Sequence, residues 1–424
     1  MIVPSIDLMN KQAVQLVGGA TRALEAGDPR PIAARFGVVG EVAVVDLDAA
    51  LGRGSNAELA RELCAIARCR VGGGIRDAAA ARAWLDAGAV KVVLGTAARP
   101  EVLRELPRER VVAALDALHG EVVVEGWRRR TGARVVERMR ELRPFVEGFL
   151  VTFVEREGRL GGPDLAAVRE LREAAGKRSL TIAGGVTTAE DVAALDRLGA
   201  EAQVGMALYT GRLTLADAVA APLVSERPDG LWPTVVVDER GVALGLAYSS
   251  RESLAAAIAM RRGVYHSRTR GVWTKGQTSG ATQDLLRVDA DCDRDALRFT
   301  VLQHGAGFCH RQTRGCWGAE RGLGALERRL AVLRDDAPPS SYTRRLLDDP
   351  ALLRSKLVEE AGELADAAEA RPVAEEAADL LYFAAVALAR AGVGLAEVEG
   401  VLDRRALLVS RRPGDAKPAP GSGR

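Results

Sequence analysis

Short apolar runs alternate with helix-like stretches over the first 225 residues. Eight runs rich in Val, Ile and Leu begin near residues 1, 42, 69, 91, 110, 148, 180 and 202, and Ala/Leu/Arg-rich segments separate most of them. Continuous apolar runs of this length are typical of parallel strands buried on both faces. Eight such units predict a (β/α)8 TIM barrel over residues 1–225, with the active-site loops at the strand ends.

Two further regions follow, each with a different pattern. Residues 228–320 hold four strand-like runs (PTVVVDE, GVALGLAY, LLRVDAD and LRFTVLQ) around one helical segment, which predicts a small α+β domain. Residues 340–412 carry Ala, Leu, Glu and Arg at helical spacing and predict an all-α domain. Between them we expect a linker at 321–339 that contains one helix-like stretch, and after them a disordered tail at 413–424.

The barrel region repeats itself after about 110 positions. Asp7 ends the first strand-like run and Asp116 the fifth, so the two carboxylates should stand on opposite sides of one barrel mouth, where they suit paired acid and base work. Glycines follow the other strands at the same offset and offer backbone N–H groups to two phosphates, one in each half. These glycines are Gly73, Gly74 and Gly95 in the first half, and Gly184, Gly185 and Gly205 in the second.

Composition narrows the class of protein. The 424 residues carry a net charge of only +2, which argues against nucleic-acid binding by bulk charge. No apolar run approaches the ~20 residues that span a bilayer, and the first ten residues do not resemble a signal peptide. We therefore expect a cytoplasmic protein without membrane or nucleic-acid partners. With only 4 His and 5 Cys, the positions of these residues carry unusual weight.

Three of the five cysteines gather within 25 residues of the second region, at Cys292, Cys309 and Cys316. Three thiolates suit Zn²⁺ with its fourth position open to water. In VDADCDRDAL, alternate residues of an extended segment share a face, so the carboxylates should converge as a Mg²⁺ site with Cys292 on the other side. The alternative is a solvated acidic turn beside unrelated thiols. The three carboxylates are Asp291, Asp293 and Asp295.

The run GVYHSRTRGVWTKGQTSG precedes this cluster and concentrates basic and hydroxyl side chains, a pattern typical of an anion cradle for phosphate groups. His266 lies in this run and His310 lies beside Cys309, and we expect both to take part in catalysis. The remaining candidates for phosphate binding are Arg268, Arg270, Lys275, Thr278 and Ser279.

The motifs AYSSRESL, SRTRGVWTKGQTSG, DCDRDAL and CHRQTRGC together closely resemble phosphoribosyl-AMP cyclohydrolase of histidine biosynthesis. The resemblance implies hydrolytic opening of the adenine ring between N1 and C6. It also implies Mg²⁺ on the three aspartates and Zn²⁺ on the three cysteines, with the zinc shared across a homodimer. Ser249 and Ser250 stand where the family usually has Met-Asn.

Paired carboxylates mark the third region. Residues three apart share a helix face, so two packed helices would bring Glu360 and Glu363 together with Glu376 and Asp379. Such a cluster suits Mg²⁺ that activates water and neutralises pyrophosphate, although glutamates on wet helix faces are the ordinary alternative. The motifs SYTRRLL, KLVEEAGE and EEAADLLYF resemble phosphoribosyl-ATP pyrophosphohydrolase. That resemblance implies cleavage between the α and β phosphates, with the four carboxylates as metal ligands.

The same resemblance implies substrate contacts from Lys356 and Glu359, while Phe383 replaces a usual His. The whole first region resembles the phosphoribosylformimino-AICAR-phosphate isomerase barrel through PSIDL, VVDLDAALG, VGGGIRD and IAGGV, among other pieces. This implies an Amadori rearrangement with Asp7 as general base and Asp116 as general acid. The segment TFVEREGRL replaces the family's TD-I-x-RDGTL, so Phe153 stands in place of an acid.

We therefore expect a histidine-pathway hydrolase that releases pyrophosphate from phosphoribosyl-ATP and then opens the ring of phosphoribosyl-AMP. The barrel is expected to be inactive or of altered specificity, because its departures from the family lie on active-site loops. One alternative is a trifunctional enzyme whose barrel also catalyses the isomerisation. Another is a scaffold whose metal sites are purely structural.

Overall fold

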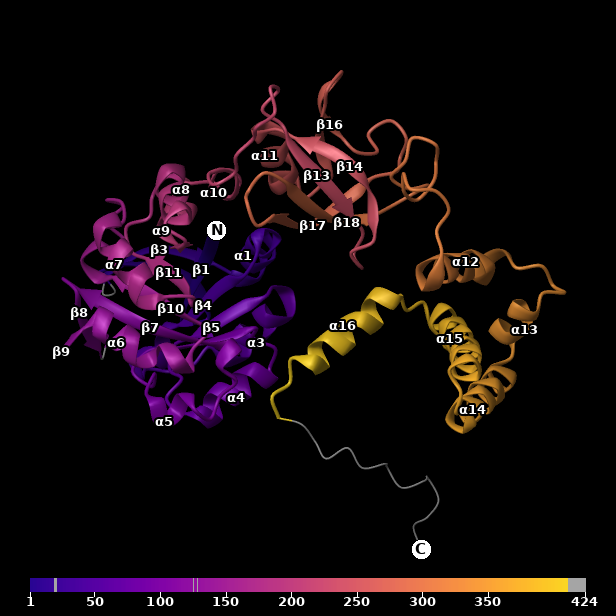
Figure 1. Ribbon diagram of the computed structural model, residues 1–424, viewed down its shortest axis with the longest axis horizontal. Coiled ribbons are helices and arrows are strands. Elements are labelled where there is room, and N and C mark those ends of the chain that lie inside the picture. The colour runs from indigo at the N-terminus through magenta and orange to yellow at the C-terminus, as the bar shows by residue number, and fades with distance from the viewer. Residues whose placement is uncertain (19–20, 125, 128, 411–424) are drawn as a thin grey trace, which may run out of the picture. The chain divides into compact units, whose positions relative to one another are not determined.

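The computed structural model describes residues 1–18, 21–124, 126–127 and 129–410, so the predicted tail at 413–424 lies outside the described residues (Figure 1). The chain forms two compact units. The first holds residues 1–241, 246–305 and the described residues from Leu407 on, and the second holds Val242–Gly245 and Ala306–Ala406. The barrel and most of the central sheet therefore belong to the first unit, and the helical region belongs to the second.

Eight parallel strands close into the predicted barrel, because β10 pairs with both β7 and β11. Each strand coincides with one of the eight apolar runs, and most of their side chains are buried. In barrel order they are β1 (Ile2–Met9), β4 (Val42–Asp46), β5 (Cys69–Gly72), β6 (Lys91–Leu94), β7 (Val111–Leu118), β10 (Gly148–Phe153), β11 (Ser179–Ala183) and β12 (Glu201–Val204).

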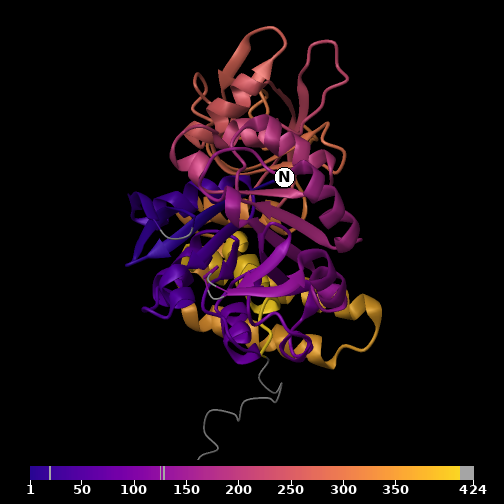
Figure 2. The same cartoon turned by 90° about the vertical axis from the view of Figure 1, so that its left-hand side faces the viewer.

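Helices lie outside the ring of strands and connect one strand to the next (Figure 1 and Figure 2). They are α1 (Pro29–Phe36), α2 (Leu47–Leu51), α3 (Ala57–Ile66), α4 (Ala78–Asp86), α5 (Pro100–Leu103), α6 (Val135–Leu142), α7 (Leu165–Ala175), α8 (Ala189–Arg197), α9 (Met206–Tyr209) and α10 (Leu215–Ala220). Aspartate side chains accept the first backbone N–H groups of several of these helices, as Asp164 does for α7.

Two antiparallel hairpins extend the barrel and show its internal repeat. Strands β2 (Gln12–Val17) and β3 (Thr21–Gly27) follow β1, and β8 (Glu121–Val124) and β9 (Arg129–Arg134) follow β7. Asp7 pairs with Val14 across the first hairpin, and Asp116 pairs with Val123 across the second, so each aspartate lies opposite the residue seven positions further on. The two halves thus place their aspartates in the same local geometry.

A layer of charged side chains crosses the barrel interior. Arg70 on β5 is 6% exposed, and its guanidinium donates to Glu201 at 2.7 Å, to Thr181 at 3.1 Å and to Glu41. A buried charge is tolerated only when its hydrogen-bonding groups are paired. The carboxylates lower the cost of burying Arg70, and in turn the guanidinium lowers the pKa of Glu201 against the opposing effect of burial.

The central domain is the predicted α+β fold. Its sheet has the order β14-β13-β18-β17, in which β13 runs parallel to β18 and β17 runs antiparallel to it. Helix α11 begins after Ser250, whose hydroxyl accepts the backbone N–H of Ser253 at 3.2 Å. The elements are β13 (Trp232–Val237), β14 (Ala243–Ser249), α11 (Arg251–Met260), the hairpin β15 (Val264–Ser267) and β16 (Gly271–Thr274), β17 (Gln283–Ala290) and β18 (Leu297–Gln303).

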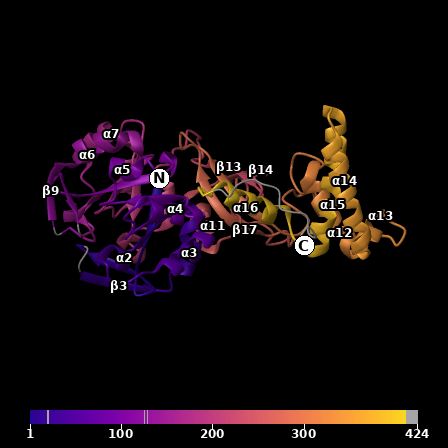
Figure 3. The same cartoon turned by 90° about the horizontal axis from the view of Figure 1, so that it is seen from below.

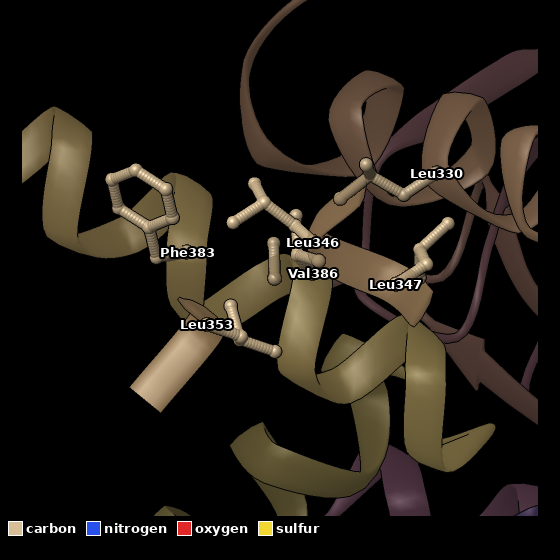
Figure 4. Close-up of a cluster of buried hydrophobic side chains, with 7 residues drawn as sticks. Leu330, Leu346, Leu347, Leu353, Phe383 and Val386 are labelled. Atoms are coloured by element: carbon tan, nitrogen blue, oxygen red, sulfur yellow. The ribbon is translucent and has the colours of Figure 1, made fainter. Parts of the chain in front are cut away.

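The helical region is built around one apolar cluster that contains Leu346, Leu353, Phe383 and Val386 (Figure 4). Helices α14 and α15 lie side by side (Figure 1 and Figure 3). The helices are α12 (Gly322–Asp336), α13 (Tyr342–Asp348), α14 (Pro350–Asp366), α15 (Ala370–Ala391) and α16 (Leu395–Ala406).

The linker expected at 321–339 is wrong for most of its length, because α12 occupies it. Leu330 of α12 is 1% exposed within the apolar cluster, and the backbone N–H of Leu395 donates to Glu327 at 2.6 Å. The turn-rich segment DDAPPSS covers only residues 335–341, whereas the residues before it form a helix that buries Leu330. Only residues 337–341 remain between α12 and α13.

In the part of the chain that the structure describes, no single helix is long and apolar enough to cross a membrane. The pair Ala370–Ala391 and Leu395–Ala406 reaches the required length and composition only when taken together, with a bend of 106° between them.

Candidate active sites

Asp7 and Asp116 lie at the ends of the first strands of the two half-barrels, and both are partly buried. Burial disfavours the charged carboxylate and raises the pKa of Asp7 to about 7. Burial also raises the pKa of Asp116, although hydrogen bonds from Trp127 and Thr152 oppose the shift. Two carboxyl groups whose pKa values are raised by burial suit acid and base work at the barrel mouth.

Glu157 is a third carboxylate at this site, and we did not predict it. Burial, together with the negative charges of Asp7 and Asp116, raises its pKa to about 7. Glu157 occupies the second acidic position of the family pattern TD-I-x-RDGTL. The acid of the family pattern is lost at Phe153, which is 5% exposed in the core, but an acid is retained at Glu157.

The predicted phosphate-binding glycines follow directly after β5, β6, β11 and β12. Gly184, Gly185 and Gly205 line one small polar pocket together with Ser5 and Glu157. At Gly184 the backbone has φ +88°, and a Cβ atom would lie 2.5 Å from the carbonyl oxygen of Phe153. A side chain would clash at this position, so glycine is required where the backbone lines the pocket.

The first half-barrel has the matching arrangement at Gly73 and Gly74. A Cβ atom on Gly73 would lie 2.3 Å from the carbonyl oxygen of Asp46. At Gly95, apart from its chain neighbours, no atom of the described residues lies within 4 Å of the corresponding point. The two glycine groups stand after equivalent strands of the two halves, as a substrate with a phosphate at each end would require.

In the central domain the three aspartates converge, but not in the way we expected. Strand β17 ends at Ala290, and residues 291–296 form a turn in which Asp291 accepts the backbone N–H groups of Asp295 at 3.1 Å and Ala296 at 3.2 Å. The expectation of an extended segment with alternating faces is therefore wrong, because the Asp291 side chain closes a turn over residues 291–296. Ligand oxygens of Asp291, Asp293 and Asp295 still lie within 4.8 Å of one another.

The charges in this turn affect one another. The hydrogen bond with Asp291 and the charge of Asp293 raise the pKa of Asp295. Burial disfavours the charge on Asp291, but backbone N–H donors outweigh it and lower the pKa of that carboxyl. A set of close, mostly exposed carboxylate oxygens fits a hard divalent cation such as Mg²⁺.

Cys309 and Cys316 lie in one loop of the second unit, where Phe308 donates to the carbonyl of Arg314 at 2.9 Å and Cys309 donates to that of Thr313 at 3.1 Å. Hydrogen bonds from the Arg311 N–H, Thr313 and Cys316 lower the pKa of the Cys309 thiol. A thiol that ionises readily fits a Zn²⁺ ligand. Cys292 belongs to the first unit, so the three-thiolate zinc set remains a prediction.

The other predicted residues of the central domain lie on or near the β15–β16 hairpin. His266 pairs with Val272, and its Nδ1 atom is buried with no hydrogen-bond partner within the described residues. Lys275 is 7% exposed. Arg268 stacks on Tyr248 and Arg270 stacks on Trp273, whereas Thr278 and Ser279 are exposed in the following loop. His310 lies with its Nδ1 3.9 Å from the Cys309 sulfur.

The helical region brings together three of the four predicted carboxylates. Ligand oxygens of Glu360 and Glu363 from α14 and of Glu376 from α15 lie within 4.8 Å of one another. Burial, together with the neighbouring carboxylates, raises the pKa of Glu376. Asp379 contributes to that electrostatic effect, but its oxygens lie outside the close group.

Lys356 lies directly beside this carboxylate cluster. Its ammonium is 2.8 Å from a Glu359 oxygen and 3.0 Å from a Glu360 oxygen. Both carboxylates raise the pKa of Lys356, so the side chain is a cation at neutral pH. The arrangement places one positive charge beside the carboxylate cluster of Glu360, Glu363 and Glu376, where it can bind a phosphate group.

Comparisons with known proteins assign families to all three regions. Residues 1–214 match the histidine biosynthesis protein family, residues 245–318 match phosphoribosyl-AMP cyclohydrolase, and residues 323–406 match phosphoribosyl-ATP pyrophosphohydrolase. An imidazole-4-carboxamide isomerase of Methanocorpusculum labreanum is 38% identical over 233 residues, which are 52% of this chain and 98% of that relative.

Fungal relatives combine several activities by name. The histidine biosynthesis trifunctional protein of Komagataella pastoris is 49% identical over 207 residues, and the bifunctional protein of Schizosaccharomyces pombe is 49% identical over 208 residues. Each match covers 49% of this chain, but only 25% of the first relative and 50% of the second. With a family match over half of its length and two further pathway domains behind it, the chain belongs to the histidine biosynthesis protein family.

Proposed function

We propose that this chain carries out three reactions of histidine biosynthesis: pyrophosphate release from phosphoribosyl-ATP, hydrolytic ring opening of phosphoribosyl-AMP, and the Amadori isomerisation that follows. The observation that carries the third activity is the group of three carboxylates at the barrel mouth. Asp7 and Asp116 keep their symmetric positions, and Glu157 keeps an acid where the family has one. This replaces our first expectation of an inactive or altered barrel, and the names of the relatives favour it.

In the barrel, the substrate would bind across the mouth with one phosphate at each glycine group. Asp116, whose pKa is raised by burial, donates a proton as the sugar ring opens. Asp7, whose pKa is about 7, then accepts the proton from C2 of the opened sugar. The resulting enolamine takes up a proton at C1 as its C2 hydroxyl loses one, so that the aldose becomes the ketose. Glu157 lies close enough to both for its charge to influence each transfer.

In the central domain, the nucleotide phosphate would meet the basic hairpin that carries Arg268 and Arg270. Zn²⁺ held by the thiolates would supply hydroxide at neutral pH for attack on C6 of the adenine ring. The residues present fit a Zn²⁺ ion, since Cys309 and Cys316 share a loop and hydrogen bonds lower the pKa of the Cys309 thiol. His310, whose Nδ1 lies 3.9 Å from the Cys309 sulfur, would move a proton beside the thiolates, and His266, whose buried Nδ1 has no hydrogen-bond partner among the described residues, would do so beside the basic hairpin.

In the helical domain, Glu360, Glu363 and Glu376 fit divalent metal, because three crowded carboxylates lose mutual repulsion when a cation joins them. Mg²⁺ there would activate water and neutralise the departing pyrophosphate. Lys356 would bind the phosphate chain beside them, with Glu359 holding its ammonium in place.

The test supplies phosphoribosyl-ATP to the full-length protein with Mg²⁺ and Zn²⁺, and follows pyrophosphate, the ring-opened product and the ketose. All three should accumulate in turn. An Asp7→Asn variant should stop before the ketose while releasing pyrophosphate at the normal rate. Accumulation of the ring-opened product by the unaltered protein would instead show a barrel without isomerase activity. Failure of every step would favour the scaffold alternative.

A further inference from the structure

Phe383 occupies the position where the pyrophosphohydrolase family usually has histidine, and the proposed function gives it no role. The residue lies on α15, seven positions and about two turns after Glu376, and is 5% exposed. Figure 4 shows its ring at one end of the apolar cluster with Leu346 and Leu353. The same helix therefore carries one carboxylate of the cluster and one ring of the apolar core.

The ring of Phe383 also touches a charged side chain. The Lys356 ammonium lies 5.5 Å from the centre of the ring, in the position of a cation–π contact. The side chain of Lys356 is 22% exposed, so water screens this contact only in part. The same ammonium is 3.0 Å from Glu360, whose own side chain is 7% exposed. Phe383, Lys356 and Glu360 thus form a continuous contact from the core to the cluster.

The ring is itself fixed in place. Tyr382 and Tyr342 approach it nearly edge-on, with ring centres 5.3 and 6.4 Å away and interplanar angles of 72° and 85°. The hydroxyls of Tyr382 and Thr343 lie 2.8 Å apart and hydrogen bond, which holds that tyrosine. A ring restrained on two sides offers a rigid seat for a long, otherwise mobile lysine side chain.

A phenyl ring and an imidazole would affect the cluster differently. A neutral imidazole can bind a divalent cation or compete for a carboxylate, and a protonated one repels an ammonium. A phenyl ring does neither and attracts the ammonium through its face. If Glu360 were to ligate a metal, Lys356 would lose that ion pair and would keep the contact with the Phe383 ring.

We propose that Phe383 is a positioning residue that seats the Lys356 ammonium beside the carboxylate cluster, so that the charge is in place for the phosphate chain of the substrate. The inference rests on the proposed pyrophosphate release. It predicts that loss of the ring weakens substrate binding through Lys356, while the chemical step at the metal-type cluster proceeds at its normal rate.

Nuclear magnetic resonance on the full-length, metal-free protein tests the seat directly. The chain has six lysines, at 11, 91, 177, 275, 356 and 417, so ¹³C labelling at the ε carbon gives few signals, and Lys356→Arg identifies the relevant one. A ring beneath the ammonium should move the Lys356 ε protons upfield of those of the exposed Lys177. Phe383→Leu should remove the shift, and Phe383→Tyr should keep it. An unshifted Lys356 signal in the unaltered protein would overturn the proposal even if every variant failed to fold.

Kinetics of pyrophosphate release test the consequence. In Phe383→Leu, KM for phosphoribosyl-ATP should rise about 3- to 10-fold with kcat within about 2-fold, a size expected for one partly exposed cation–π contact. Phe383→Tyr should restore KM. In a Lys356→Met background, Phe383→Leu should raise KM no further. A fall in kcat alone, or the same added increase without Lys356, would show that Phe383 acts only through packing. If the unaltered protein releases no pyrophosphate, the proposed function fails, while the NMR signal of Lys356 still tests whether its ammonium lies over the Phe383 ring.

Discussion

At the scale of single residues, burial of the Asp7 carboxyl at the barrel mouth lowers the free energy of unfolding once that group must ionise. Asp7 titrates in the folded protein at a pKa of about 7, whereas an aspartate in an unfolded chain titrates near about 3.9. The folded state therefore retains a proton between these values that the unfolded state has lost. By linkage, stability falls as pH rises through this window, because the folded state must either keep the proton or bury the charge.

Replacing Asp7 by asparagine should therefore stabilise the fold at pH 8 while it abolishes isomerisation. We expect a gain of about 1–3 kcal/mol in the free energy of unfolding at pH 8, shrinking towards zero near pH 4. Urea unfolding at both pH values measures it. Asp196→Asn is the matched control of opposite sign, since Arg294 and the amino terminus lower the pKa of Asp196 against its burial. Equal urea midpoints for Asp7→Asn and the unaltered protein at pH 8 would contradict the assignment.

The same carboxylates predict the pH dependence of catalysis. If Asp7 is the base, kcat/KM for isomerisation should fall below about pH 7, because the protonated form cannot accept the substrate proton. Glu157 titrates near the same pH and is coupled to Asp7 by charge. Glu157→Gln removes one negative charge and should therefore shift the acidic limb of the kcat/KM profile to lower pH. A limb that stays in place in Glu157→Gln would show that the two groups do not interact.

At the scale of elements, side-chain capping stabilises the N-terminus of helix α11 in the central domain. Ser250 and Ser253 form a reciprocal capping box at the first turn of α11, although the family usually has Asn at 250. Both residue types accept a backbone N–H at this position. The departure noted in the sequence is therefore conservative in its physical effect.

Ser250→Ala should lower the free energy of unfolding by about 1 kcal/mol, because a backbone N–H in the first turn of α11 loses its acceptor. Ser250→Asn is the control and should stay within about 0.3 kcal/mol of the unaltered protein, since the amide oxygen caps equally well. Thermal unfolding of the full-length protein distinguishes the two. An asparagine variant as unstable as the alanine variant would mean that Ser250 acts through something other than the cap.

The elements also show how far sequence reasoning reaches. Each of the eight barrel strands could be predicted, because strands buried on both faces leave a continuous apolar run. The turn at Asp291 could not, since alternating aspartates fit a strand and a capped turn equally well. The helix α12 was half predicted: its letters ALERRLAVLR indicated a helix, but the tertiary contact of Leu330 that makes it part of the domain has no local signature.

At the scale of the whole molecule, the three candidate sites use different residues in the three regions that match different families, so each activity should be lost separately. Glu360→Gln should abolish pyrophosphate release but leave ring opening of supplied phosphoribosyl-AMP unchanged. Cys309→Ala should do the reverse, so that phosphoribosyl-AMP accumulates from phosphoribosyl-ATP. Product analysis of each variant with each substrate measures both. Loss of both activities in either variant would show that the regions depend on one another.

The short connection between α12 and α13 has a consequence for limited proteolysis. Residues 337–341 contain two prolines and two serines and leave α12 through a non-helical turn, the kind of segment a protease reaches first. Cleavage there should not release the helical domain, because Leu330 stays buried in its core and Glu327 holds the start of α16. A nicked protein should therefore run as two fragments on a denaturing gel and still elute as one species from a sizing column.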